Sequence, residues 1–133
     1  MLTLVVPNTL KIIKIVKWLT ALIVISFLIL CLRPVPSLTS ANARTAIGIV
    51  KNITEGGIKD AVFHLENNDR IYYINRGFEN GLDLSDLKNK LLGREVRITY
   101  PHHWTPLDWN GKAMHMSRLE IGEEIVFEES KRY

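Results

Sequence analysis

The sequence predicts an N-terminal transmembrane helix followed by a small, mainly-β domain. Residues 12–32 are almost continuously apolar, which is the composition and length of a membrane span. From Thr45 onward, apolar residues tend to recur at every second position, which is typical of strands with one buried face. The 133 residues therefore divide into a cytoplasmic N-terminus and helix (1–32), a linker (33–44) and the domain (45–133).

The basic charge of the chain lies in its N-terminal third. The first 44 residues contain no acid and carry +5 from Lys11, Lys14, Lys17, Arg33 and Arg44. The other twelve of the 17 Lys and Arg residues are set against all 14 acids, so residues 45–133 carry −2 and the total is +3. A nucleic-acid-binding domain normally presents a basic stripe to phosphates. This balance argues against nucleic acid as a partner.

The segment Trp18–Leu32 is predicted to hold the chain in a membrane. Its fifteen residues would be short for a hydrocarbon core of about 30 Å at about 1.5 Å per residue. Extension back to Ile12 gives twenty-one residues, provided that the two included lysines reach the headgroups. Trp18 is then expected at the interface, and Arg33-Pro34 is expected to end the helix.

Two fates of this segment follow from its flanks. Three lysines precede the span and two arginines follow it, so the positive-inside rule exports the C-terminal domain from the cytoplasm. Ala41-Asn42-Ala43 has the A-x-A form of a signal cleavage site, so the alternative is a secreted or periplasmic protein cleaved after Ala43. The eleven residues Arg33–Ala43 are long for the stretch before such a site. We therefore expect an uncleaved, single-pass anchor in the inner (cell) membrane.

The domain is predicted to contain three strands, a helix and two further strands. The apolar pattern places the strands at 45–54, 59–66, 70–75, 94–100 and 112–121, with a short sixth strand at 124–129. In the first strand, the alternating apolar residues are Ile47, Ile49 and Ile53. In the fifth, the apolar positions change phase between Met116 and Leu119, which indicates a bulge near Ser117.

Turn and cap residues support these boundaries. Asn67-Asn68-Asp69 is a hairpin signal, because Asn and Asp tolerate positive φ. Asp83 or Ser85 can cap a short helix with a leucine stripe, and Gly93 follows its end.

The element order β-β-β-α-β-β over residues 45–121, with the Gly93–Val96 start of the fourth strand, resembles the OB-fold, a five-stranded Greek-key barrel. The whole chain is similar to small bacterial proteins that carry an OB-like domain on a membrane tether or export it, and to which no activity is assigned. The resemblance implies a five-stranded barrel and gives almost no information about function.

The most distinctive stretch is YPHHWTPLDWNGKAMH, Tyr100–His115. In an OB-like barrel it includes the connection between the last two strands, which flanks the usual ligand face. Tyr100, Trp104 and Trp109 are candidate stacking platforms for a ligand. The competing interpretation is that a tryptophan folds inward to cover the open end of the barrel.

Two arginines complete the candidate ligand-binding set. Arg76, in the stretch INRGFENG, can pair with Glu79 or hold an anion. Arg97 belongs to a possible basic group for nucleic acid, which would require convergence on one face with an exposed tryptophan; its other members are Arg94, Lys112 and Arg118.

The metal and enzyme hypotheses have less support in the sequence. Zinc-type ligands occur at His102, His103, Asp108 and His115, but neighbouring residues of an extended segment point to opposite faces. No hydrolase, metalloprotease or nucleotide-binding motif is present, so we expect no cofactor and no enzyme. The expected function is a binding or interaction module of the cell envelope, whose partner is another envelope protein or a glycan. A tethered nucleic-acid-binding domain and a metal-dependent hydrolase are the alternatives.

Overall fold

A computed structural model of the chain describes residues 6–129, and all structural statements concern these residues. The extreme N-terminus (1–5) and the last four residues of the predicted domain (130–133) lie outside them. The chain divides into two compact units, one built on the N-terminal helix and one on a β-sheet. Each is described by itself.

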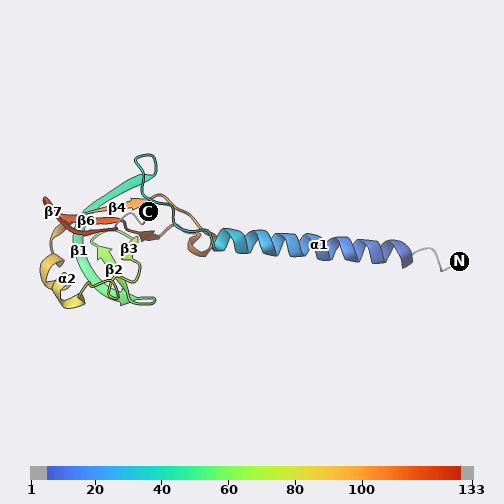
Figure 1. Ribbon diagram of the computed structural model, residues 1–133, viewed down its shortest axis with the longest axis horizontal. Helices are drawn as coiled ribbons and strands as arrows, with labels where there is room; N and C mark the ends of the chain where they lie inside the picture. The colour runs from blue at the N-terminus through green and yellow to red at the C-terminus, as the bar shows by residue number, and fades with distance from the viewer. Residues whose placement is uncertain (1–5, 130–133) are drawn as a thin grey trace. The chain divides into compact units, whose positions relative to one another are not determined.

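The N-terminal unit contains a single long helix, α1 (Val6–Cys31) (Figure 1). Its 26 residues correspond to about 39 Å at 1.5 Å per residue. The stretch Asn8–Cys31 has a mean hydropathy of 2.3 in its most apolar window, and none of that window is buried. The helix is thus long and apolar enough to cross a membrane. It ends at Cys31, shortly before Arg33-Pro34, as predicted.

The second unit is a mixed seven-stranded sheet with one helix. Its order along the sheet is β5-β3-β2-β1-β4-β6-β7. All neighbouring pairs are antiparallel except β3 with β5, which are parallel. The strands are β1 (Ala43–Gly56), β2 (Asp60–Leu65), β3 (Ile71–Ile74), β4 (Glu95–Pro101), β5 (Ala113–His115), β6 (Arg118–Ile121) and β7 (Glu124–Glu128).

The predicted five-stranded OB barrel is therefore wrong, although the helix and the mainly-β domain are confirmed. The predicted fifth strand, 112–121, divides into β5 and β6, and β7 extends the sheet beyond β6. The division has a clear cause: Met116 N donates to Tyr73 O on β3, whereas Ser117 N donates to Thr99 O on β4. The chain changes its partner strand between these two residues. The phase shift in the sequence marks this exchange, and the sheet is not closed.

A bulge in β1 corrects the predicted face of its isoleucines. The first half of β1 pairs with β4, the second half pairs with β2, and the register shifts between Val50 and Asn52. One extra residue reverses the inward and outward positions. Consequently Val50 and Ile53 are buried, whereas Ile47 and Ile49 are 57% and 39% exposed.

The short helix α2 (Leu84–Leu91) has the predicted caps. Asp83 is its N-cap and accepts a hydrogen bond from Asp86 N. Gly93, just past its end, has φ +72°, a conformation that costs glycine least. Gly93 N also donates to Val50 O at 2.9 Å, which ties the end of the helix to the bulge of β1.

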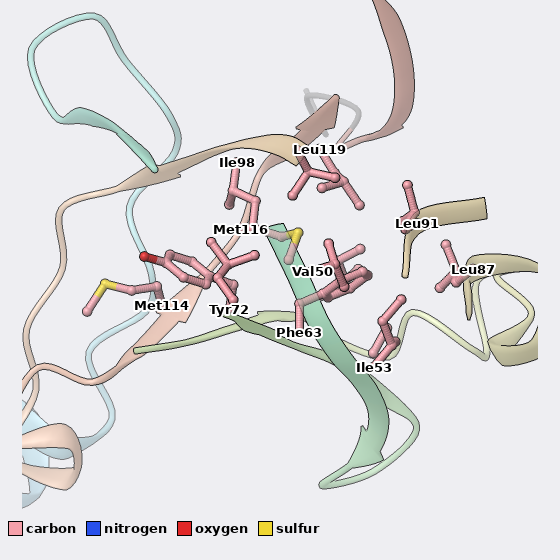
Figure 2. Close-up of a cluster of buried hydrophobic side chains, with 14 of the residues drawn as sticks. Val50, Ile53, Phe63, Tyr72, Leu87, Leu91, Ile98, Met114, Met116 and Leu119 are labelled. Carbon is pink, nitrogen blue, oxygen red and sulfur yellow. The ribbon is translucent and has the colours of Figure 1, made fainter. Parts of the chain in front are cut away.

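The core of the domain lies between α2 and the inner face of the sheet. Leu87 and Leu91 of α2 lie at one end of the cluster and Tyr72 and Met114 at the other (Figure 2). Alternating residues of β2 and β4 are buried, as expected for strands with one buried face; these are Ala61, Phe63, Leu65, Val96, Ile98 and Tyr100.

Two neighbouring leucines test this account of the core. Leu91 is fully buried and Leu92 is 41% exposed. We expect Leu91→Ala to lower the free energy of unfolding by about 2–5 kcal/mol, because it leaves a cavity, and Leu92→Ala by less than about 1 kcal/mol. Denaturant unfolding of the full chain in detergent, followed by the near-ultraviolet signal of the buried tyrosines, measures both. Equal losses would contradict the assigned core.

Candidate functional site

The aromatic loop, defined as residues 102–112 between β4 and β5, begins where the linker joins the sheet. Ala43, the first residue of β1, is the register partner of Pro101, the last residue of β4. One step further, His102 N donates to Asn42 O at 2.8 Å. Pro101 has no N–H, and it lies at a position of the antiparallel ladder where the residue does not donate a hydrogen bond to the neighbouring strand. The start of the domain and the start of the loop are therefore side by side.

The last part of the linker is folded into a turn. Ala43 N donates to Thr39 O at 2.9 Å. The Asn42 side chain closes the turn, since its Oδ1 accepts from Thr39 N at 2.7 Å and its Nδ2 donates to Ser37 O at 2.9 Å. Residues 37–43 thus belong to the domain rather than to a free tether. The remaining linker, residues 33–36, has the sequence RPVP.

Asp108 holds the second half of the aromatic loop. It ends the short 3-10 helix η1 (Pro106–Asp108). Its two carboxylate oxygens accept from Lys112 N at 3.1 Å and from Ala113 N at 3.0 Å. Its carbonyl accepts from Gly111 N at 3.0 Å, and Gly111 has φ +62°. The single acid of the loop therefore acts as a structural acceptor, which removes it from the predicted metal ligands.

Both tryptophans of the aromatic loop point toward solvent. Trp104 is 50% exposed and Trp109 is 80% exposed. The indole Nε1 of Trp104 donates to Trp109 O at 3.4 Å, a long hydrogen bond between the two. The interpretation of a tryptophan as an inward-folded lid is therefore wrong, and the loop presents large apolar side chains.

Tyr100, the third predicted aromatic platform, lies in the core instead. It is 5% exposed, and its ring lies 5.6 Å from that of Tyr72. Its hydroxyl accepts from Arg70 Nη1 at 3.1 Å. It follows the inward alternation of Val96 and Ile98 along β4, so it cannot share a surface with the two tryptophans.

The two predicted arginines lie on other parts of the domain. Arg76 is in the turn after β3, where its Nε pairs with Glu79 at 3.2 Å and its backbone N donates to Asp60. Arg97 is exposed on β4, between its register partners Ile47 and Glu120. Among the described residues, neither arginine forms a hydrogen bond or ion pair with residues of the aromatic loop.

The predicted basic group for nucleic acid is partly neutralised. Arg118 forms ion pairs with Glu120 at 2.9 Å and with Glu128 at 3.4 Å. Lys112 lies 3.8 Å from Asp69. Carboxylates beside these cations weaken any phosphate-binding surface.

The histidines do not gather into a metal site within residues 6–129, where no three His, Cys, Asp or Glu side chains have a suitable arrangement. His102 is exposed and His103 is half-buried. His115 on β5 lies 3.3 Å from Glu129, and its ring meets that of Tyr73 edge-on.

A polar cluster at the end of the described chain was missed by the sequence analysis. Glu129 Oε2 accepts from the buried Ser117 Oγ at 3.2 Å and also faces His115 Nε2. Serine and histidine bind the same carboxylate rather than each other, so the arrangement lacks the contact of a nucleophile with its base. No motif links these three residues in the sequence, because the cluster depends on how the end of the chain returns along β6.

Tyr73 on β3 has a perturbed phenol. Burial raises the pKa of its phenol above the ordinary 10.0, and the carboxylates of Asp60 and Asp108 add to this. The phenol therefore stays protonated near neutral pH and cannot serve as a base there.

Comparison of the chain with protein-family models, with curated proteins and with solved structures gives no match. The function must therefore be argued from the site alone.

Replacement of Asp108 tests whether this residue holds the aromatic loop. We expect Asp108→Ala to speed hydrogen exchange of the amides of Lys112 and Ala113 and to lower the free energy of unfolding by about 1–3 kcal/mol, because two backbone donors, one exposed and one part-buried, lose a charged acceptor. The matched control is Asp69→Ala, which removes an exposed carboxylate 3.8 Å from Lys112 and should leave exchange unchanged. Unaltered exchange in Asp108→Ala would show that other contacts hold the loop.

Proposed function

We propose that the protein is a single-pass membrane protein whose exported β-domain acts as a binding module in the cell envelope, with the aromatic loop as its contact surface. The observation that supports the proposal is the exposure of Trp104 and Trp109 on a loop that the hydrogen bonds of Asp108 hold in place. Exposed aromatic side chains on a rigid support are typical of binding surfaces.

The membrane anchor rests on the apolar surface of α1. Its exposed large apolar side chains extend from Leu10 to Leu30. Leaving them in water would cost on the order of 20 kcal/mol at about 25 cal/mol per Å². This exceeds the stability of a typical domain, about 5–15 kcal/mol, so the helix needs a cover such as the lipid of a bilayer.

The uncleaved state is favoured over cleavage after Ala43 by the fold of the linker. Asn42 accepts from His102 N, and its side chain closes the turn from Ser37. Cleavage after Ala43 would remove Asn42, the turn and the first residue of β1. The three lysines at the N-terminal end of the apolar helix favour a cytoplasmic N-terminus and an exported domain.

Binding is favoured over catalysis because the polar side chains near the loop already form hydrogen bonds within the domain. Asp108 is occupied by two backbone donors, and Ser117 and His115 share Glu129. Nucleic acid is a weaker candidate than a component of the envelope, because Arg118 is held between two carboxylates.

Anchorage and export are tested with one pair of double variants. We expect Ile23→Lys with Ile25→Lys to release the chain from alkali-washed membranes, since each lysine at the centre of a span costs about 2.5–3.5 kcal/mol. The control adds the same charge to the exposed face of β1, as Ile47→Lys with Ile49→Lys, and should remain in the membrane.

A phosphatase that is active only outside the cytoplasm, fused after Tyr133, reports the side. Activity is expected for the unchanged chain and for the control. An inactive fusion would contradict export, and membrane retention of the Ile23→Lys, Ile25→Lys variant would contradict the span.

A further inference from the structure

We propose that the ligand of the aromatic loop is the lipid–water interface of the same membrane that holds α1. The loop would be a second, peripheral membrane contact that fixes the orientation of the domain. This inference deepens the proposed function and rests on its anchorage and export.

The chain between the apolar segment and the sheet is short. Ten residues, 33–42, separate the end of the apolar segment from the first residue of β1. Six of these belong to the turn that Asn42 closes, so the free tether is RPVP, at most about 14 Å when extended. The sheet places Pro101 beside Ala43. Trp104, three residues after Pro101, is therefore on the part of the domain nearest to the membrane along the chain.

The helix and the linker supply no tryptophan or tyrosine for the outer membrane–water interface. Trp and Tyr are enriched at both membrane interfaces, where the ring is apolar and its polar group meets water. Trp18 occupies the lysine-rich side of the apolar segment, but no Trp or Tyr occurs from residue 19 to residue 71. The outer interface thus has no such residue from the helix or the linker. Trp104 and Trp109 supply two.

The charges around the loop favour lipid headgroups. Its single acid, Asp108, accepts hydrogen bonds from Lys112 N and Ala113 N. Arg44, the register partner of Tyr100, is exposed at the start of the loop, whereas Lys112 at its end lies 3.8 Å from Asp69, which offsets its charge. An exposed arginine beside apolar tips matches an anionic headgroup layer over acyl chains.

A glycan or a protein partner fits these observations less well. Sugar recognition needs polar groups that bind hydroxyls beside the stacking ring, and the carboxylate of this loop is already occupied. Neither partner accounts for the position of the loop beside the tether. The bilayer accounts for the aromatic residues, the flanking charge and the position together.

The test uses the full chain in vesicles of phosphatidylethanolamine and phosphatidylglycerol, with one tryptophan at a time. Trp18→Phe with Trp104→Phe leaves Trp109, and Trp18→Phe with Trp109→Phe leaves Trp104. The matched control carries Ile58→Trp with all three native tryptophans changed to Phe. Ile58 is 69% exposed, close to the value for Trp109, but it lies in the turn at the opposite end of β1.

We expect emission from Trp104 and Trp109 to shift to shorter wavelength and to be quenched by lipids brominated near the headgroup, with protection from aqueous iodide. The Ile58→Trp control should emit as in water and respond to iodide alone. Emission from both loop residues that matches the control would overturn the inference. So would a response only to added soluble cell-wall glycan, which would make the ligand a sugar.

Flotation of the same samples separates this inference from the proposed anchorage. A chain that floats with the vesicles but keeps water-exposed loop tryptophans retains its anchor and lacks the second contact. A chain that does not float loses the anchor, and both proposals fail.

Discussion

The antiparallel pairing of the first half of β1 with β4 is the interaction on which the rest of the molecule depends. Its last rung, Ala43 with Pro101, joins the domain to its linker and starts the aromatic loop at the same place. The opposite end of this ladder is the bulge after Val50, which turns the second half of β1 toward β2 and receives the end of α2 through Gly93. One ladder thus sets both the core and the position of the candidate site.

The local elements could be predicted from the sequence, whereas the register and the pairing of the strands could not. Periodicity of two, the cap at Asp83 and the glycine at 93 depend on neighbouring residues, and the structure confirms them. The exposure of Ile47 depends on the register shift between Val50 and Asn52, further along the same strand. The division of the predicted fifth strand depends on the change of partner strand after Met116. Both features depend on which strands pair and in which register, and the alternation of apolar residues does not determine either.

The candidate site shows the same limit. The sequence identified Trp104 and Trp109 as the residues that matter, but not their direction, because an indole is equally suited to a core and to a surface. Tyr100 was grouped with them by proximity in sequence, yet the inward alternation of β4 carries it into the core. Asp108 was grouped with the histidines by residue type, although its carboxylate serves the backbone of its own loop.

The pairing of Ala43 with Pro101 is tested most directly by a disulfide. The pair lies at a position without mutual hydrogen bonds, where Cα atoms are about 4.5 Å apart, within the disulfide range of about 4.4–6.8 Å. In the full chain with Cys31→Ser, mild oxidation should link Ala43→Cys to Pro101→Cys, as measured by mass spectrometry of the intact membrane protein. Ala43→Cys with Thr99→Cys, two residues out of register, should stay reduced. No bond in the first variant, or equal bonding in the second, would contradict the register that places the aromatic loop beside the tether.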